Sequence, residues 1–235
     1  MAADLILPWK GEAFRLIPSR FPPVEIYEEV VTGDRVPALV EIENLTNPRL
    51  RSAQRLMTAA EGIAPDSARL QNWNHAPFAY SNPEGSRFFP PESPCVELAD
   101  TRQTALAVSV ARREFFLNRT SEPAIGLDMR MLKTPVDGRF LDLRDIDPSM
   151  DRDRRWALCA TLPDEVDGVL YRPPERPSAT CVSVRAARAL QRSIQTEHYR
   201  YIWNGIRVTK LYAFDNAGTE LSPAALAGSD DVIAA

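Results

Sequence analysis

The sequence of 235 residues contains few of the residue types that bind metals or form cross-links. It has two histidines, His75 and His198, and three cysteines, Cys95, Cys159 and Cys181. These residues do not cluster at the spacing of metal ligands, so we predict no metal site. An odd number of cysteines argues against a disulfide framework and fits the reducing environment of the cytoplasm.

The sequence also lacks the apolar runs of a membrane protein. No apolar stretch approaches the roughly 20 residues that span a bilayer. The N-terminus, MAADLILPWKGEAFRL, has no cationic start followed by a long apolar run, so we expect no signal peptide. We therefore predict a cytoplasmic protein with no membrane partner.

A large excess of charge of either sign is absent as well. The formal net charge is -4, which gives no electrostatic reason to expect direct binding to nucleic acid. Glycine is scarce, with 10 residues, while proline reaches 20 and occurs in clusters. The proline clusters predict several rigid loops between short elements.

The patterns that are present predict one α+β domain, with central β-sheets, flanking helices and a C-terminal β-hairpin. Apolar periodicity and cap residues predict helices at residues 36–45, 52–63, 101–117, 151–164 and 186–194. Alternating or continuous apolar runs predict strands at residues 12–18, 94–100, 127–132, 139–145, 168–171, 180–185, 198–203 and 206–212.

Two dipeptides predict turns between these strands. Asp137-Gly138 separates the strands at 127–132 and 139–145. Asn204-Gly205 separates the last two strands and is the preferred pair for a type I′ hairpin. In the first strand of this hairpin, Tyr199, Tyr201 and Trp203 alternate with other residues, so we expect these three side chains on one face of the strand.

The sequence also predicts a helix cap and the behaviour of the C-terminal stretch. Asp100 or Thr101 caps the helix at 101–117, and Gln103 stands three residues after Asp100 in a variant of the capping box. The last stretch, SPAALAGSDDVIAA, is small and polar, so we expect it to fray.

Two Arg-Phe pairs follow predicted strands or turns and are candidates for ligand binding. They are Arg20-Phe21 in IPSRFPP and Arg87-Phe88 in PEGSRF. An arginine can bind a phosphate with two hydrogen bonds, and a phenylalanine ring can stack on a base. The alternative is the commoner arrangement, in which each arginine pairs with a surface carboxylate and each phenylalanine packs in the core.

A set of ordered motifs resembles the RES domain family in its longer form. The motifs are FRLIPSRFPP, ENLTNPRL, APFAYSNPEGSRF, DTRQTALA, DGVLY and HYRYIWNGIRV, and they extend from about Phe14 to Tyr212. The resemblance implies an N-terminal extension at residues 1–13, a RES-like domain at 14–214 and a flexible tail at 215–235. It also implies a fold similar to that of ADP-ribosyltransferase toxins.

The resemblance further implies a chemistry and a partner. RES proteins include toxins of bacterial toxin–antitoxin pairs that consume NAD+ by hydrolysis, by phosphorolysis or by transfer of ADP-ribose. NAD+ would be a substrate or ligand, and no cofactor is required. The usual antitoxin caps the pocket. Cleavage of the nicotinamide–ribose bond passes through an oxocarbenium-like state, which a nearby carboxylate stabilises.

Three polar positions of the family pattern are occupied by residues that cannot perform the same roles. Where the family has Tyr-Tyr, this sequence has Val96 and Glu97. Val108 replaces the family's glutamate, and Pro173 replaces its serine. The resemblance therefore predicts an eroded catalytic site.

Other family positions are retained. Both Arg-Phe pairs match, and Tyr171 matches a ligand-binding tyrosine; Arg176 stands near the family's later arginine. The ligand-binding residues that the resemblance implies are Arg20, Phe21, Arg87, Phe88 and Tyr171.

Three hypotheses remain open. The first is a weak or inactive RES homologue that binds nucleotide, or a partner such as an antitoxin-like protein, an active RES homologue or a second copy of itself. The second is a working NAD+-consuming toxin in which Glu97 has taken over as the catalytic acid; Glu114 and Glu175 are weaker candidates. The third is a structural protein that reuses the fold.

Overall fold

The computed structural model describes residues 5–19, 71–79, 82–214 and 218–233. The helices predicted at 36–45 and 52–63, and the Arg20-Phe21 pair, lie outside the described residues. The observed elements are β1 (Ile6–Pro18), α3 (Asn72–Ala79), β2 (Val96–Ala99), α4 (Arg102–Leu117), β3 (Ile125–Asp142), α5 (Arg152–Ala160), β4 (Gly168–Tyr171), β5 (Cys181–Val184), the 3₁₀ turn η2 (Ala187–Ala189), β6 (Ile194–Trp203), β7 (Val208–Ala213), β8 (Glu220–Leu221) and α6 (Pro223–Leu226).

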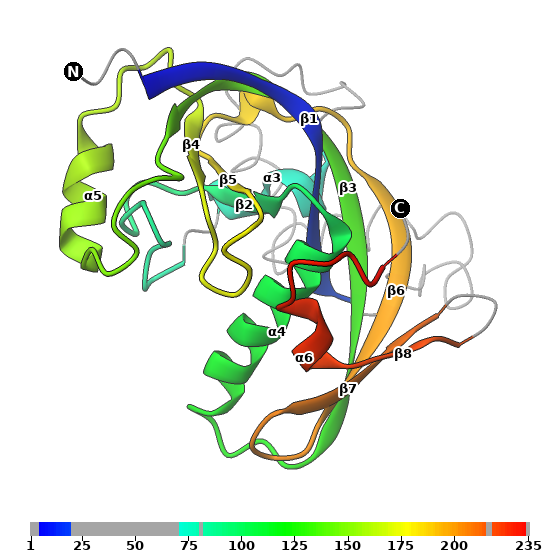
Figure 1. The fold of residues 1–235 in the computed structure, drawn as a ribbon. Helices are drawn as coiled ribbons and strands as arrows, with labels where there is room; N and C mark the ends of the chain where they lie inside the picture. The colour runs from blue at the N-terminus through cyan, green and yellow to red at the C-terminus, as the bar shows by residue number, and fades with distance from the viewer. Residues whose placement is uncertain (1–4, 20–70, 80–81, 215–217, 234–235) are drawn as a thin grey trace, which may run out of the picture.

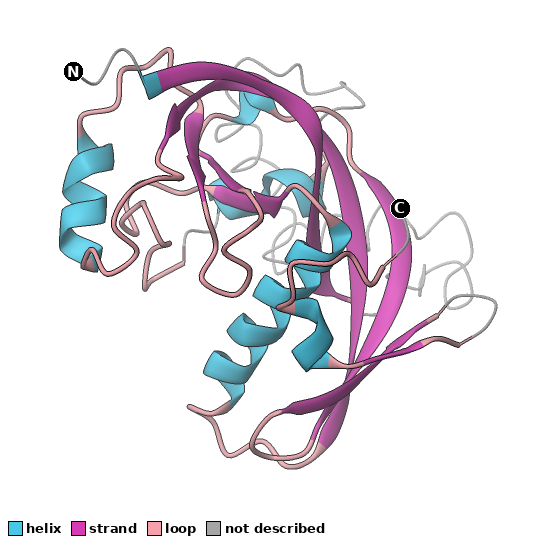
Figure 2. Cartoon of the chain, in the orientation of Figure 1, coloured by secondary structure: helices cyan, strands magenta, loops and turns pink. Residues whose placement is uncertain are grey.

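The described strands form one mixed sheet of eight strands in the order β1-β2-β5-β4-β3-β6-β7-β8, and β1 also pairs with β3. The β1–β3 pairing closes β1, β2, β5, β4 and β3 into a ring. Among the described strands only β3 and β4 run parallel, and the other pairs are antiparallel. Figure 1 shows β1, β3 and β6 as long, curved strands side by side, with α4 and α6 close to one another. The secondary-structure colouring in Figure 2 shows an α+β domain, as predicted.

The short strands β2, β4 and β5 have two different faces because side chains alternate along a strand. On one face, Val96 and Leu98 pack with Val182, Val184 and Leu170 in a buried cluster. The other face presents Glu97 from β2, Tyr171 from β4, and Cys181 and Ser183 from β5. This second face contributes to the cavity described below.

The predicted turn at Asp137-Gly138 is wrong, because β3 is one strand through residues 127–142. Pairing with β1 keeps this segment extended, with Trp9 opposite Gly138 and Lys10 opposite Asp137. Gly138 instead makes room for a neighbour: a Cβ atom there would lie 2.7 Å from Asp167 Oδ2. That oxygen accepts a hydrogen bond from the Arg139 backbone at 2.9 Å.

The predicted helix at 186–194 is also wrong, because only η2 is helical in this region. The backbone groups that a longer helix would use are bonded elsewhere. Gln191 N donates to Pro135 O at 2.9 Å, and Ser193 N donates to the Gln71 side chain at 2.7 Å. Long-range pairing of this segment therefore overrides its local helical pattern.

The predicted hairpin is confirmed, but its turn type is wrong. Tyr199, Tyr201 and Trp203 are all buried, as their alternation predicts. A type I′ turn needs positive φ at both central residues. Gly205 has a φ of 97°, whereas no non-glycine residue in the described ranges has a positive φ. Instead, the Asn204 side chain accepts hydrogen bonds from the backbone of Ile206 and Arg207.

Both ends of the described chain contact the sheet or its covering helix. The predicted strand at 12–18 is confirmed as part of β1, which begins at Ile6 and crosses the predicted domain boundary at residue 13. At the other end, Leu226 of α6 is buried. The guanidinium of Arg176 donates to Gly228 O, Ser229 O and Asp231 Oδ1. These contacts differ from the predicted frayed tail.

The cap of α4 is Thr101, whose side chain accepts a hydrogen bond from Thr104 N at 3.2 Å. The predicted capping role of Gln103 is wrong: its side chain bonds the backbone of Leu226, Asp230 and Val232. None of the described helices is both long and apolar enough to cross a bilayer.

Candidate functional site

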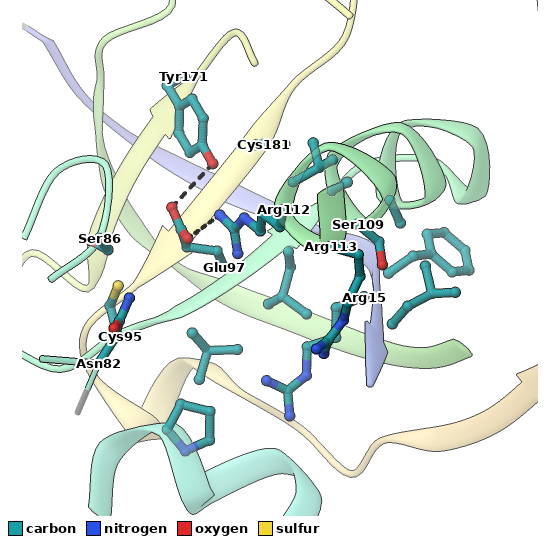
Figure 3. Close-up of a pocket in the computed structure, with 18 of the residues that line it drawn as sticks. Arg15, Asn82, Ser86, Cys95, Glu97, Ser109, Arg112, Arg113, Tyr171 and Cys181 are labelled. Carbon is teal, nitrogen blue, oxygen red and sulfur yellow. Dashed lines mark hydrogen bonds and ion pairs between the residues drawn. The ribbon is translucent and has the colours of Figure 1, made fainter. Parts of the chain in front are cut away.

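A cavity of about 520 Å³ opens between α4 and the face of β2, β4 and β5 that carries Glu97. We call it the Glu97 cavity. Its described lining comes from β1, β2, α3, α4, the loop at 82–86, β4 and β5. Figure 3 shows Glu97, Arg112 and Tyr171 meeting at one part of this cavity, with the Arg15 and Arg113 side chains in another part.

One face of α4 lines the Glu97 cavity. The residues share the spacing of one helical face and are Ala105, Val108, Ser109, Arg112, Arg113 and Phe116. Val108, which replaces the family's glutamate, is therefore a cavity residue. Its side chain offers neither charge nor a hydrogen bond at this position.

The Glu97 carboxylate is bonded by three side chains. Arg112 forms an ion pair with Oε2. Tyr171 and Ser183 each donate a hydroxyl to Oε1 at 3.3 Å. Ser183 lies directly opposite Glu97 in the β2–β5 pairing. Tyr171 is the last residue of β4, the strand on the other side of β5. The Glu97 side chain is only 10% exposed, whereas that of Arg112 is 52% exposed.

The environment keeps these partners in defined protonation states. The nearby Glu97 carboxylate raises the pKa of Arg112, so the guanidinium stays charged. Burial, together with the negative charge of Glu97, raises the pKa of Tyr171 well above its usual range. Tyr171 is therefore a neutral hydrogen-bond donor to Glu97, and proton abstraction by a Tyr171 phenolate is disfavoured.

Two further arginines line the Glu97 cavity. Arg15 on β1 donates through Nη2 to the backbone oxygen of Trp73, and its buried Nε has no partner among the described residues. Burial lowers the pKa of Arg15 to about 10 and also lowers the pKa of Arg113. Neither arginine forms an ion pair within the described ranges. Both remain cationic at neutral pH.

Of the predicted pair Arg87-Phe88, only the arginine lines a cavity. Phe88 is buried, with its ring centroid 4.9 Å from that of Tyr171. The Arg87 guanidinium lies 5.9 Å from the Phe88 ring and 5.8 Å from the Tyr171 ring, in cation–π range. Arg87 lines a second cavity of about 640 Å³, which also includes Glu97 and Arg112. We call this the Arg87 cavity. The ligand-binding roles of Arg87 and Phe88 stay predictions.

The remaining predicted residues occupy separate places. Pro173 is buried and lines neither cavity. Glu175 lines the Arg87 cavity. Glu114 points to the hairpin, where its carboxylate accepts a hydrogen bond from Val208 N at 2.7 Å. Arg176 holds the C-terminal segment and hydrogen-bonds Thr101.

The described residues contain no group of three or more His, Cys, Asp or Glu side chains that could hold a metal ion. The three cysteines are free thiols. Burial raises the pKa of Cys95 and of Cys159 to about 12. These thiols are therefore protonated and poor nucleophiles at neutral pH.

The fold and the site define an α+β domain with a half-enclosed cavity that carries one paired carboxylate and three arginines. The sequence model of the RES domain matches residues 64–204, and the chain belongs to the RES domain family. The chain is also 58% identical over 225 residues to the uncharacterised protein y4oC of Sinorhizobium fredii (strain NBRC 101917 / NGR234). That alignment covers 96% of this chain and 97% of the relative.

Four residues of the site were not predicted: Arg15, Arg112, Arg113 and Ser183. A signal for two of them was present, because Arg112 and Arg113 follow Val108 and Ser109 at the four-residue spacing of one helical face. Ser183 was also visible as a polar residue inside the short apolar strand CVSV, where every residue is buried. Arg15 had no such signal.

Proposed function

We propose that this RES-family protein keeps a ligand cavity but has little or no catalytic activity toward NAD+, and that it acts by binding a nucleotide or a protein partner. The pairing of Glu97 with Arg112 is the main support. Glu97 is the one carboxylate in the described lining of the Glu97 cavity, and the guanidinium of Arg112 already offsets its charge.

The electrostatic reason follows from the transition state of NAD+ cleavage. An oxocarbenium-like ribose carries positive charge, so it is stabilised by an unopposed negative charge nearby. A carboxylate that is already in contact with one cation attracts a second positive charge much less strongly. Val108 supplies no second carboxylate. Loss of a principal electrostatic stabiliser typically lowers rates by about 10²–10³-fold.

Nucleotide binding is the second part of the proposal. The Glu97 cavity and the Arg87 cavity share Glu97 and Arg112. Arg15 and Arg113 line the first cavity, and Arg87 lines the second. Arginine is well suited to bind phosphate oxygens. The two cavities together therefore suit an elongated ligand that carries phosphate groups.

The test compares NAD+ consumption by the purified protein with that of an active RES-family enzyme at equal concentration. We expect a rate lower by about 10²-fold or more, from the size of the missing stabilisation. Rapid NAD+ loss with many turnovers per protein molecule would contradict the proposal. In parallel, thermal unfolding is followed with millimolar NAD+ or ADP-ribose. Stabilisation by either supports nucleotide binding; no shift with either favours a structural protein that reuses the fold.

A specific observation also favours a second candidate function. Tyr171 and Ser183 fix the Glu97 carboxylate at the cavity wall, which is how an active site orients a catalytic acid. Under this alternative the protein is a working NAD+-consuming toxin with a relocated carboxylate. Glu97→Gln would then abolish NAD+ consumption, whereas under the first proposal the slow background rate is unchanged.

The protein partner is proposed on the exposure of two aromatic residues. Phe115 and Phe116, at the end of α4, are 62% and 58% exposed, and both line the Arg87 cavity. Exposed aromatic residues that line a cavity are typical of binding surfaces. The candidates are an antitoxin-like protein, a RES homologue or a second copy of the chain.

Strong expression in bacterial cytoplasm, with growth as the readout, checks for toxicity. Growth arrest favours the toxin, and normal growth favours the weak or inactive homologue.

A further inference from the structure

We propose that the C-terminal segment regulates the ligand site through the loop that connects β4 to β5. We call residues 222–233 the strap and residues 172–180 the β4–β5 loop. While the strap is attached, it fixes this loop and thereby Tyr171 and Glu175, which line the two cavities. Detachment of the strap loosens the loop and weakens ligand binding. The link to ligand binding rests on the proposed function, whereas the link between strap and loop does not.

The strap buries little apolar surface. The structure describes the whole strap, and within it only Leu226 is buried, while Ile233 packs half-buried against the core. Figure 1 shows its helix α6 beside α4. A segment with few buried apolar contacts opens at a lower free energy than the core of the same protein. The strap can therefore detach while the sheet stays folded.

Polar side chains from the body of the domain hold the strap. Gln103 on α4 is buried, and its Nε2 donates to Leu226 O at 3.2 Å and to Asp230 O at 3.0 Å. Its Oε1 accepts a hydrogen bond from Val232 N at 2.7 Å. All of these bonds go to the backbone of the strap, so Gln103 holds the path of this segment and not a particular side chain.

Arg176 joins the strap to the β4–β5 loop. It lies in the loop, its side chain is buried, and every N–H group of its guanidinium has an acceptor. The acceptors are three strap oxygens and two hydroxyls at the start of α4, namely Gly228 O, Ser229 O, Asp231 Oδ1, Thr101 Oγ1 and Thr104 Oγ1. When the strap leaves, a buried cation loses most of its acceptors, which is unfavourable. Movement of Arg176 toward solvent, together with its loop, relieves this cost.

The β4–β5 loop transmits the movement to both cavities. Tyr171 directly precedes the loop and Cys181 directly follows it, and both line the Glu97 cavity. Glu175, the residue before Arg176, lines the Arg87 cavity. A loop that is fixed at Arg176 therefore keeps cavity residues in place for a ligand, and a loose loop does not.

The middle of the β4–β5 loop is the part that depends on the strap. The end of the loop is anchored to the body, since Thr180 N donates to Asp100 Oδ2 at 2.8 Å. In the middle, the amides of Arg176 and Ala179 donate to backbone oxygens within the loop, and these bonds break when the loop opens. Hydrogen exchange of these two amides therefore reports on the attachment of the strap.

The first test follows hydrogen exchange of the wild-type protein without ligand, at urea concentrations below the unfolding transition. We expect the strap amides and the amides of Arg176 and Ala179 to exchange through one opening, with the same dependence on urea. This opening should need less free energy than that of β3 and β6. Exchange of the loop amides together with the sheet, or independently of the strap, would overturn the proposal.

The second test uses Gln103→Met and Leu226→Ala, which weaken the strap at residues that belong neither to the loop nor to the lining of the two cavities. Methionine keeps the approximate size of Gln103 but forms none of its hydrogen bonds. We expect strap and loop amides to exchange about tenfold faster or more in both variants, from the loss of hydrogen bonds or of a buried side chain. Faster exchange of the strap with an unchanged loop contradicts the coupling, as does unchanged exchange of both.

Two matched controls lose similar groups at exposed positions. Gln195→Met changes an exposed glutamine of β6, and Val232→Ala shortens an exposed side chain of the strap itself. Both should exchange like the wild type at the strap and at the β4–β5 loop.

The third test adds saturating NAD+ or ADP-ribose to the wild type. Coupling between two sites is reciprocal, so a ligand that prefers the ordered loop also favours the attached strap. We expect strap exchange to slow about fivefold or more. If a nucleotide binds and strap exchange is unchanged, nucleotide binding stands and regulation by the strap is wrong. If neither nucleotide binds, nucleotide binding is wrong, and exchange without ligand still decides whether strap and loop are coupled.

Discussion

Ser183 on β5 lies directly opposite Glu97 on β2, and its hydroxyl donates a hydrogen bond to the Glu97 carboxylate at 3.3 Å. The serine is fully buried, so its hydroxyl needs this acceptor. The pair links the sheet to α4, because the same carboxylate is bound by Arg112. Glu97 therefore has a structural role whether or not it has a catalytic one.

Glu97→Gln should lower the free energy of unfolding by about 1–2 kcal/mol. The charged hydrogen bonds become neutral ones, and the loss is moderated because Arg112 is half exposed to solvent. Urea denaturation provides the measurement. Glu122→Gln, at an exposed glutamate, should change stability by less than about 0.5 kcal/mol. Equal stability of Glu97→Gln and wild type would show that the ion pair contributes nothing.

Val108→Glu should raise the rate of NAD+ consumption by about tenfold or more, if absence of an unopposed acid limits the reaction. Val108 lines the Glu97 cavity, so a carboxylate there reaches the space that a ligand would occupy. Val108→Gln has nearly the same shape without the charge and serves as the control. An equal rate for both variants would mean that the eroded site lacks more than the acid.

Gly168→Ala should destabilise the protein by more than about 3 kcal/mol or prevent folding. A Cβ atom at Gly168 would lie 1.9 Å from Ser183 O, and the φ of 155° disfavours a side chain. Gly205→Ala is the control: its φ is 97°, but nothing lies within 4 Å of the added atom. It should cost about 1–2 kcal/mol from backbone strain alone. Similar losses for the two variants in thermal and urea unfolding would contradict the steric explanation.

Arg176→Met should release the C-terminal segment from α4 and lower stability by about 2–4 kcal/mol, because a nearly fully buried guanidinium serves three acceptors of that segment. Hydrogen exchange of residues 222–233 should become faster than in the wild type. Asp231→Asn removes only an exposed partner, whose side chain is 64% exposed, and should cost less than about 1 kcal/mol. Unchanged exchange in Arg176→Met would rule out this role.

Stability should fall as pH rises from about 9 toward 12. The pKa values of Cys95 and Cys159 are raised to about 12 in the folded protein, whereas unfolded thiols ionise near 8.5. Above pH 9 the unfolded chain has therefore lost protons that the folded chain retains, which favours unfolding. Cys159→Ala should reduce the slope of unfolding free energy against pH. A flat profile between pH 9 and 11 would contradict the burial of these thiols.

Local sequence patterns correctly predicted the elements whose secondary structure depends mainly on their own residues. Thr101 caps the N-terminus of α4 because its hydroxyl can accept a backbone hydrogen bond. The alternation of Tyr199, Tyr201 and Trp203 follows from strand geometry. Local patterns were wrong where pairing with residues far along the chain determines the secondary structure. Asp137-Gly138 has turn residues, but pairing with β1 holds it extended.

The site was predictable only in part for the same reason. Glu97, Val108 and Tyr171 were found by matching the family pattern, and all three line the Glu97 cavity. The ion pair between Glu97 and Arg112 joins residues 15 positions apart on different elements, so it depends on how α4 packs over β2. Arg15 belongs to a strand whose neighbours could not be assigned before the sheet order was known.

The ring closed by β1 sets the minimum length of chain that a separately expressed fragment must include. A fragment cut to the RES match at residues 64–204 would omit β1, the strand that pairs with both β2 and β3. It would also omit β7, the hairpin partner of β6. Unpaired strand edges promote aggregation. A soluble fragment for structural or binding work should therefore begin no later than Ile6 and continue past α6.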